Sequence, residues 1–561
     1  MTTRAEHDQQ QEARTDAVVI GGGVSGLVAA LRAAQGGLRV LVLEKLQEER
    51  YVCNSRLTQG VWHCGLADLL SEPAVLEARI MEVTAQSARK DLSHVVAKDA
   101  LRTVRWLQAV GIRFVKGPLD YQSFVLAPPS VTATGREWEN RGGDVMLRTL
   151  EAELVRLGGS IRRGHRAKRL VMHGGRLAGI EGEDAQGRAF SYTTNAVVIA
   201  DGGFQANDDL TRRHSYRRPE AVFQRNARTG MGDGLTMATE VGAAVTDLSA
   251  FYGHILSKDA FTNEQLSPYP FLDYVMPSGI LVDKHARRWV DEGQGGIVVA
   301  NAIAQSEDPS DKIVIVDDAI WNDTGKFRLL SPNPWLERVG GTLHRADSIE
   351  KLARLCGLDP AALAETVATY NCAVRGGTAA NLEPRRTTTA AYKPQPIATG
   401  PFYAIPVCAG ITYTMGGITI NADSQVLTEA QQQIPGLYAV GCATGGLEGG
   451  PAVGYIGGLV KSGVTGLRAG EHIVAALAPA RVEAAPSTLK TYPAVVFLSK
   501  HGRRIATLAA ASIALVAQIP AAMGHGAGWS VGGLVAAALA WGIIRVGAEV
   551  VEVVADTLLP R

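Results

Sequence analysis

The sequence predicts an α/β fold with three parts: a nucleotide-binding domain on a parallel sheet, an inserted α+β domain, and a C-terminal helical hairpin. A strand–turn–helix–strand pattern with G-x-G-x-x-G spacing near the N-terminus predicts the first part. A shift to more Pro, Trp and irregular sequence from about residue 246 predicts the second part. The stretch from Ile505 to Ile544, which has no Asp, Glu, Lys or Arg, predicts the third. At 561 residues the chain is long enough for two or more hydrophobic cores.

The first predicted strand, Ala17–Ile20, leads into a turn that carries Gly21, Gly23 and Gly26. In this spacing the first glycine allows the tight turn, the second lets a pyrophosphate approach the backbone, and the third lets the helix pack closely on the strand. The helix that begins near Val24 would point its free N–H groups and its dipole at the phosphates. The pattern therefore predicts a Rossmann-like dinucleotide site.

A second apolar run, Val40–Leu43, ends on Glu44. An acid about 20 residues past the glycine turn accepts hydrogen bonds from the ribose hydroxyls of an adenosine. Because strand, turn, helix, second strand and acid all coincide, this motif is more specific than a lone G-x-G-x-x-G in a chain with 62 glycines.

The next elements alternate between helix and hairpin signals. Residues 60–115 are rich in helical periodicity, and a helix is expected over 143–158, where Gly-Gly ends it. His173–Gly175 and Asp184–Gly187 have the composition of hairpin turns. The apolar run Ala196–Ala200 then predicts a strand that returns to the nucleotide-binding sheet.

These signals give the predicted domain boundaries. Residues 15–245 form the first part of the nucleotide-binding domain, 246–389 the inserted domain, 390–475 the second part of the first domain, 476–499 a linker, and 500–561 the hairpin and tail.

The C-terminal hairpin is predicted to span a membrane. Residues 505–523 and 529–544 are uncharged, each is close to membrane-spanning length, and a short glycine-containing turn separates them. Lys and Arg flank both outer ends but are absent from the turn, which predicts a membrane-associated protein whose catalytic body faces the cytoplasm. A buried helical hairpin in a soluble core is the alternative, because alanine-rich helices also pack there.

The charge balance and the cysteines exclude several function classes. With 56 basic and 55 acidic residues, there is no electrostatic case for a nucleic-acid partner. The six cysteines show no C-x-x-C and no haem, iron–sulfur or zinc spacing, so no metal site is expected. The first 15 residues are polar and lack the apolar stretch of a signal peptide.

Further motifs are spread along the chain. They are GGGVSG with Glu44 and Lys45, CNSRLTQG at 53–60, VVIADGGFQAN at 197–207, GMGDGLTMATEVGA at 230–243, SGILVDKHARRWVDEG at 278–293, GPFYAI at 400–405, TMGGITI at 414–420 and GLYAVGCATGG at 436–446. On these motifs, residues 15–475 resemble the FAD-binding family of fumarate reductase and succinate dehydrogenase flavoproteins, which includes 3-ketosteroid and tricarballylate dehydrogenases. The resemblance implies a Rossmann-like FAD-binding domain with an inserted α+β substrate (capping) domain, followed here by the C-terminal helical hairpin.

By this resemblance the cofactor is FAD rather than NAD. Family members with covalent FAD carry a histidine in the segment that matches Asn54–Gly60, whereas this chain has Arg56, so noncovalent FAD is expected. Cys442 stands where the family has an acid that helps to hold the flavin, and a buried packing role is expected for it rather than a redox role. The expected cofactor-binding residues are Gly21, Gly23, Val24, Ser25, Gly26, Glu44, Lys45, Asn54, Ser55, Thr58, Gly60, Gly202, Asp233 and Gly441.

The substrate side departs from the fumarate reductases that the chain resembles. Tyr413 stands where their histidine precedes T-M-G-G, Tyr455 stands at the position of a clamp arginine, and no arginine follows Glu292. Only His254 matches the family's substrate-side histidine, and Arg386 is expected at the solvated surface. Because cations are needed to clamp two carboxylates, a neutral hydrophobic carbonyl substrate is expected instead of a C4-dicarboxylate.

The expected catalytic residues are therefore Tyr455, Tyr413 and His254, which resembles the ketosteroid dehydrogenases, where tyrosines handle the substrate. One tyrosine, with its pKa lowered by its neighbours, would take the α-proton while another donor stabilises the developing enolate. The β-hydride would go to flavin N5, and the same geometry run backwards would reduce an activated double bond.

Two other functions remain open at this stage. One is a carboxylate ene-reductase or dehydrogenase of the fumarate reductase or tricarballylate dehydrogenase type, with charges supplied by other loops. The other is a noncatalytic, membrane-bound flavoprotein that transfers electrons. A quinone or another electron acceptor is the expected redox partner.

Overall fold

In the computed structural model, residues 15–130, 134–135, 137–327 and 330–478 are described, together with parts of 506–546. The chain divides into two compact units, residues 1–478 and 479–561. The first unit contains two six-stranded sheets and two large hydrophobic cores.

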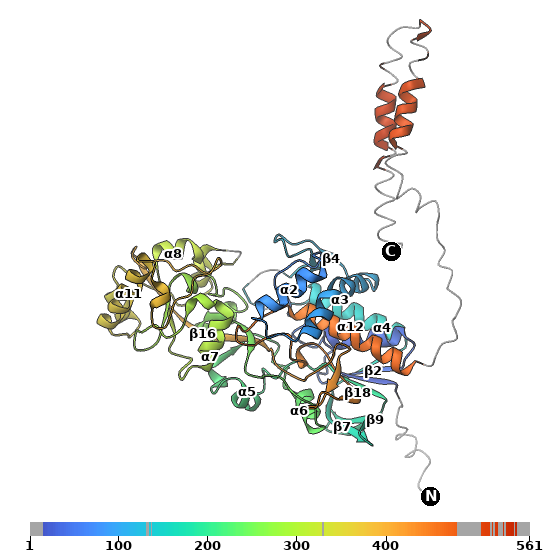
Figure 1. Ribbon diagram of the computed structural model, residues 1–561, viewed down its shortest axis with the longest axis horizontal. Helices are drawn as coiled ribbons and strands as arrows, with labels where there is room; N and C mark the ends of the chain where they lie inside the picture. The colour runs from blue at the N-terminus through green and yellow to red at the C-terminus, as the bar shows by residue number, and fades with distance from the viewer. Residues whose placement is uncertain are drawn as a thin grey trace. The chain divides into compact units, whose positions relative to one another are not determined.

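The first sheet is built around the predicted strand–turn–helix–strand segment (Figure 1). β1 pairs in parallel with β2 on one side and with β10 on the other, so the predicted return of residues 196–200 to this sheet is confirmed. Both β1 and β10 are buried along their whole length, as expected for apolar runs in a parallel sheet that is covered on both faces. The strand order is β17 (Gln425–Leu427), β18 (Gln433–Ala439), β10 (Ala196–Ile199), β1 (Ala17–Ile20), β2 (Val40–Glu44) and β6 (Ser160–Arg163), with only β17 antiparallel.

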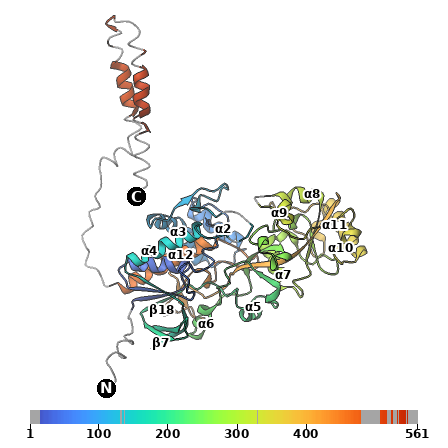
Figure 2. The same ribbon diagram turned by 180° about the vertical axis from the view of Figure 1, so that it is seen from behind.

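Helices cover one face of this sheet, and a three-stranded antiparallel sheet covers the other, as both views show (Figure 1 and Figure 2). The helix predicted over 143–158 is confirmed as α4, and the two predicted hairpin turns join β7 to β8 and β8 to β9. The covering elements are α1 (Val24–Gln35), α4 (Gly142–Arg156), α12 (Gly458–Leu477), β7 (His165–His173), β8 (Arg176–Asp184) and β9 (Ala189–Thr193). α3 (Lys90–Ala109) packs on α12, and α2 (Pro73–Val83) packs on α3.

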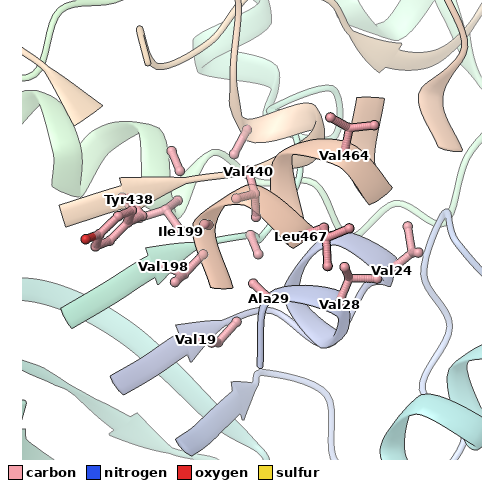
Figure 3. Close-up of a cluster of buried hydrophobic side chains, with 14 of the residues drawn as sticks. Val19, Val24, Val28, Ala29, Val198, Ile199, Tyr438, Val440, Val464 and Leu467 are labelled. Carbon is pink, nitrogen blue, oxygen red and sulfur yellow. The ribbon is translucent and has the colours of Figure 1, made fainter. Parts of the chain in front are cut away.

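The first core lies between the sheet, α1 and α12 (Figure 3). Val19 and Val198 point from the strands toward Val28 on α1 and Leu467 on α12, and all four side chains are buried. Burying a side chain of this size contributes roughly 1.5–3 kcal/mol. α12 can approach α1 closely because a Cβ on Gly466 would lie 2.5 Å from the Ser25 carbonyl oxygen. This packing fixes the start of α1 relative to the sheet.

The second sheet forms the capping domain, with β16 at its centre. Its core takes side chains from Tyr216 to Ile411, so it extends on both sides of the predicted segment 246–389. β16 pairs in parallel with β11 and antiparallel with β12, β14 and β15. The elements are β11 (Val222–Gln224), β12 (Phe251–Ser257), β13 (Ile280–Val282), β14 (Ile313–Asp317), β15 (His344–Ala346), β16 (Phe402–Thr414), α7 (Gly296–Gln305), α8 (Asp318–Asn322), α9 (Pro332–Arg338), α10 (Ile349–Leu355) and α11 (Pro360–Arg375).

Smaller elements lie outside the two six-stranded sheets. β3 (Val61–Trp62), β5 (Phe124–Leu126) and β4 (Phe114–Val115) form a short antiparallel sheet. α5 (Asp208–His214) and α6 (Asp233–Glu240) follow β10.

The second unit contains part of the predicted membrane hairpin. Residues 506–516 and 534–543 are helical, and Leu508, Leu515, Leu539 and Ile543 are exposed on them. Among the residues that the structure describes, no helix combines the length and the apolar character needed to cross a membrane. The other residues of the predicted hairpin, and most of the predicted linker, lie outside the described residues, so membrane anchoring stays a prediction.

All six cysteines are described, and all are free thiols. Burial raises the pKa of Cys53, Cys64 and Cys408 to about 12. Cys372 is exposed on α11.

Candidate active site

A cleft opens where β1, β2 and β10 end. In open α/β sheets this carboxyl edge is where ligands bind, because the strand order reverses there. The cleft is lined by nine of the predicted cofactor residues: Gly21, Gly23, Ser25, Glu44, Lys45, Asn54, Ser55, Gly202 and Asp233.

Five predicted cofactor residues do not line the cleft, and each has a structural contact instead. The Val24 N–H donates to Ser55 Oγ at 3.0 Å. Thr58 Oγ1 accepts the Gly60 N–H at 3.2 Å, and the Gly441 N–H donates to Thr465 Oγ1 at 2.9 Å. The fifth, Gly26, lies where α1 touches β1, and a Cβ there would overlap the Gly21 carbonyl oxygen.

The glycine turn leaves its open side toward the cleft. Gly21 has a φ of +103°, and a Cβ on it would lie 2.6 Å from the Ala200 carbonyl oxygen. A Cβ on Gly23 would meet no atom closer than Ser55 Oγ, at 3.3 Å. α1 begins beside it with no acidic residue in its first turn, and its N-cap residue Gly23 has no side chain to cap the helix. This helix start therefore presents positive dipole charge where a phosphate can approach closely.

Acceptors lie on the other side of the cleft. Glu44 Oε2 accepts the Gly22 N–H and its Oε1 accepts the Leu46 N–H, both at 3.0 Å, which fixes the carboxylate at the end of β2. Asp201 Oδ1 and Gln205 Oε1 are buried, line the cleft and have no partner among the described residues. Burial raises the pKa of Asp201 to about 6. Donors for a pyrophosphate and acceptors for hydroxyl and amino groups thus face one cleft, and this set fits a dinucleotide.

The three predicted catalytic residues lie together beside the cleft, and a fourth residue joins them. Tyr252 stacks on Tyr455, with ring centroids 3.9 Å apart and planes 9° apart, and lies 5.5 Å from the Tyr413 ring. Its hydroxyl is 3.1 Å from His254 Nε2. Asp273 continues the series, since its Oδ2 is 2.7 Å from His254 Nδ1.

A bulge in the second sheet brings this cluster to the cleft. Tyr252 pairs with Tyr413, but Gly253 pairs with Ile411, so Thr412 is an extra residue on β16. Bulges of this kind re-aim groups near active sites. The Thr412 carbonyl oxygen accepts a hydrogen bond from Asn54 Nδ2 at 3.0 Å, which ties the capping domain to a residue of the cleft.

Tyr413 and Tyr455 use their hydroxyls differently. Tyr413 Oη donates to the Glu448 carboxylate, with O–O distances of 3.0 and 3.1 Å. Glu448 also pairs with Lys461 Nζ at 3.3 Å, and the side chains of both ions are fully buried. Tyr455 Oη accepts the Gly458 N–H at 3.4 Å, at the start of α12, which leaves its own proton to donate.

Comparison with known proteins identifies the family. The family described as "FAD binding domain" matches residues 16–454, which is more than half of the chain. The chain belongs to this FAD-binding family. It is therefore a flavoprotein, and the donors and acceptors of the cleft are those that would hold FAD.

Relatives support an FAD-dependent oxidoreductase. The chain is 26% identical to "Fumarate reductase (cytochrome)" of Shewanella frigidimarina over 449 residues, which cover 78% of this chain and 73% of the relative. It is 25% identical to "Vinyl phenol reductase" of Lactiplantibacillus plantarum, with 81% of this chain and 95% of the relative covered. The flavoprotein is therefore an enzyme of the oxidoreductase class.

Solved structures show the same fold. The open conformation of a flavocytochrome c3 fumarate reductase matches with a TM-score of 0.60 and 22% identity over 85% of this chain and 81% of that one. A 3-ketosteroid Δ4-(5α)-dehydrogenase from Rhodococcus jostii RHA1, solved with 4-androstene-3,17-dione, matches with a TM-score of 0.63 and 21% identity over 83% and 98%. The predicted α/β architecture of an FAD-binding domain with a capping domain is thus confirmed.

One prediction about this flavoprotein is wrong. A catalytic tyrosine was expected to have a lowered pKa, but burial raises the pKa of Tyr252, Tyr413 and Tyr455 above the usual value of 10.0. The carboxylate of Glu448 raises the pKa of Tyr413 and Tyr455 further, because a phenolate beside it would be repelled. All three hydroxyls are therefore neutral donors at neutral pH.

The structure also tests the predictions for Arg386 and Cys442. Arg386 is fully buried rather than at the surface, and it donates to the carbonyl oxygens of Pro277 and Thr387. Cys442 lines the cleft and packs near Tyr252 and Tyr455. Burial raises its pKa to about 11, so it is a thiol, which agrees with a packing role.

Proposed function

We propose that this flavoprotein desaturates, or in reverse reduces, a carbon–carbon bond next to a carbonyl in a neutral, hydrophobic substrate. FAD would be held noncovalently, since Arg56 is buried in ion pairs with Asp144 and Glu151. The observation that carries the substrate class is a row of aromatic rings, with tyrosine hydroxyls at one end, beside the dinucleotide cleft.

The aromatic row continues from the tyrosine cluster into the capping domain. Phe271 stacks on His254 at 4.5 Å, and Tyr269 and Tyr274 lie 5.1 and 5.9 Å from Phe271. Phe327 follows at 5.4 Å from Tyr274. Such a surface favours a flat, apolar molecule, because aromatic faces gain from both area burial and ring contacts.

The tyrosine end of the row supplies the polar chemistry. Bound in the cleft, the flavin supplies the hydride chemistry at N5. Tyr455 would donate its hydroxyl proton to the substrate carbonyl oxygen, where negative charge develops as the α-proton leaves. A neutral donor in a buried site stabilises such charge strongly, because little water competes with it. The Tyr413 hydroxyl already donates a hydrogen bond to Glu448, so Tyr413 would support the shape of the site.

The relatives are consistent with this substrate class without fixing it. One is named for a vinyl phenol, and a neighbour in fold carries a 3-ketosteroid name. 4-Androstene-3,17-dione, the compound in that structure, has a carbon–carbon double bond conjugated to a ring ketone.

A carboxylate ene-reductase is the second candidate, and Arg225 favours it. Arg225 Nη1 donates to Thr412 Oγ1 at 2.9 Å, so its charge lies at the bulge beside Tyr413. One guanidinium can pair with one carboxylate, as in a monocarboxylate substrate, but a dicarboxylate would need a further cation.

Substrate-dependent reoxidation of the reduced flavoprotein tests the proposal. The purified protein should be yellow, and a colourless protein that takes up no FAD would refute both candidates. After anaerobic photoreduction, 4-androstene-3,17-dione should reoxidise it, while fumarate and urocanate should not. Reoxidation by fumarate or urocanate alone, lost in an Arg225→Gln variant, would establish the second candidate instead.

The redox partner and location complete the proposal. A quinone is the proposed acceptor, because the predicted C-terminal hairpin would keep the enzyme at the membrane where quinones and hydrophobic substrates dissolve. Reduction of a soluble quinone analogue by substrate-reduced enzyme is the corresponding measurement.

A further inference from the structure

We propose that Asp273, acting through His254, makes Tyr252 the residue that moves the substrate's α-proton. This inference rests on the proposed function of the same site. It assigns the proton to a residue that the sequence motifs do not mark.

The hydrogen bonds around His254 define its tautomer. Asp273 Oδ2, 2.7 Å from Nδ1, is an acceptor, so Nδ1 carries the ring proton. Nε2 is then an acceptor in the neutral ring, and the group 3.1 Å from it is the Tyr252 hydroxyl. The Tyr252 proton therefore points at His254, and the lone pairs of Tyr252 Oη are left to accept from the neighbouring Tyr455 hydroxyl or from a substrate.

Asp273 is held in place by three neighbours. Its Oδ1 accepts the Ile255 N–H at 2.9 Å, and its Oδ2 accepts from His254. Gly296, the first residue of α7, lies against it, and a Cβ there would overlap the Asp273 carboxyl carbon. The start of a helix stabilises a carboxylate. The Asp273 side chain is thus held in one position toward His254.

The surroundings of His254 favour the neutral ring before reaction. Burial lowers the pKa of His254, and Arg225 lowers it further, while Asp273 opposes them. Tyr252 is the other polar group on the ring, and Phe271 covers one face. The ring can therefore accept a proton, and Asp273 would stabilise the imidazolium that forms.

The proton step balances within these residues. The substrate Cα–H bond breaks, its proton goes to Tyr252 Oη, and its electron pair becomes the enolate. At the same time the original Tyr252 proton passes to His254 Nε2, so Tyr252 never becomes a free phenolate. The raised pKa of Tyr252 is compatible with this step, because the relay forms no tyrosinate. In the reducing direction each transfer runs backwards.

The Asp273→Asn substitution tests the relay with little change of shape. Its amide oxygen can still accept the Ile255 N–H, while its NH₂ would donate to Nδ1 and shift the ring proton to Nε2. The ring would then donate to Tyr252 instead of accepting from it. We expect kcat to fall on the order of 10²–10⁴-fold, with a much smaller change in KM.

Two readouts separate this mechanism from a merely structural role. Long-range ¹H–¹⁵N spectra of ¹⁵N-histidine-labelled enzyme, assigned with His254→Asn, should show a proton on Nδ1 in the wild type and on Nε2 in Asp273→Asn. Exchange of the α-protons of 5α-androstan-3-one in D₂O, without electron acceptor, should fall in Asp273→Asn and in Tyr252→Phe as much as turnover does.

The capping domain offers matched controls. Tyr403 Oη donates to Asp318 at 2.9 Å away from the site, so Tyr403→Phe and Asp318→Asn remove the same groups there and should leave exchange unchanged. If the wild type exchanges α-protons and Tyr252→Phe does so equally fast, the relay is wrong although the proposed function stands. An unshifted tautomer in Asp273→Asn would also overturn it. If the wild type exchanges no ketone α-proton, the proposed function itself fails. If Asp273→Asn does not bind FAD, the exchange rate of Tyr252→Phe alone tests the relay.

Discussion

At the scale of single residues, the three tyrosines of the site differ by the partner of each hydroxyl. The Tyr413 hydroxyl donates a hydrogen bond to Glu448, the Tyr252 hydroxyl faces His254, and the Tyr455 hydroxyl accepts the backbone N–H of Gly458. Burial raises all three pKa values, so none is a base on its own. Their roles therefore follow from hydrogen-bond direction, which residue type alone does not encode.

The Tyr455→Phe and Tyr413→Phe variants should behave differently. Loss of the Tyr455 hydroxyl removes the proposed donor to the substrate carbonyl, so kcat should fall on the order of 10²–10³-fold with folding nearly unchanged. Loss of the Tyr413 hydroxyl leaves Glu448 one donor short, so its main effect should be a lower free energy of unfolding, by roughly 1–3 kcal/mol. Steady-state kinetics and urea unfolding measure both. Full turnover in Tyr455→Phe would remove it from the mechanism.

The Glu448–Lys461 ion pair should be costly to break from one side. Both side chains are fully buried, and Lys461 Nζ also donates to the Thr444 carbonyl oxygen at 2.9 Å. Lys461→Met would leave a buried carboxylate without its cation and should destabilise the fold by roughly 3–5 kcal/mol. The double variant Lys461→Met/Glu448→Gln should recover most of that loss. Equal destabilisation in the single and double variants would contradict the ion-pair account.

At the scale of secondary-structure elements, the glycine turn assigns separate tasks to neighbouring glycines. We expect the free energy of unfolding of Gly23→Ala to stay within about 1 kcal/mol of the wild-type value, because its Cβ meets only Ser55 Oγ at 3.3 Å. FAD affinity should fall at least about tenfold, since the methyl group fills the phosphate approach. Gly26→Ala should instead destabilise the FAD-free protein, because its Cβ overlaps a backbone oxygen. FAD titration and urea unfolding of both variants check this contrast, and equal FAD affinity in Gly23→Ala and wild type would contradict it.

Asp201, where β10 ends, should make stability depend on pH. Its Oδ2 accepts the Gly234 N–H at 2.8 Å in the first turn of α6, and burial raises its pKa from 3.8 to about 6. The folded state therefore binds this proton more tightly, and stability falls as pH rises from about 4 to 6, by about 3 kcal/mol in total. In FAD-free Asp201→Asn that fall should be missing. Urea unfolding at pH 4, 5, 6 and 7 gives the free energy of unfolding against pH. Parallel curves for variant and wild type would exclude this contribution of Asp201.

Local patterns predicted the strands and turns of the first sheet correctly, because runs such as Ala17–Ile20 and Ala196–Ala200 carry their own signal. The Thr412 bulge has no such signal, since it arises where β16 meets β12, and Thr412 there accepts from Asn54 of the other domain. Tyr252 and Asp273 were missed for the same reason. They meet His254 only after the capping sheet has folded, and Asp273 comes from a loop outside any motif.

At the scale of the whole molecule, the family motifs predicted the FAD-binding domain and the existence of a capping domain. The extent of the second core, from Tyr216 to Ile411, was not visible in composition, because β11 and β16 join it from segments that resemble the first domain in sequence. Burial also decided the sign of the tyrosine pKa shifts, and burial is a property of the assembled chain. The prediction that Arg386 lies at the surface was wrong for the same reason.

A chain ending at Ala478 should fold and bind FAD on its own, because residues 1–478 form one compact unit. We expect the same FAD stoichiometry and the same Tm as the full chain. The full chain should sediment with membranes and need detergent, while the shortened one should stay in the supernatant. A full chain that needs no detergent would contradict the membrane hairpin, and loss of FAD on shortening would contradict the independence of the unit.

The burial of the cysteines gives the molecule a practical property. Thiols react as thiolates, and the raised pKa values of Cys53, Cys64, Cys356, Cys408 and Cys442 keep all five protonated at neutral pH. Cys372 is the exposed one, on α11 of the capping domain. A maleimide dye would therefore attach at a single place on the native enzyme without any engineered cysteine, and its fluorescence would report on the capping domain alone.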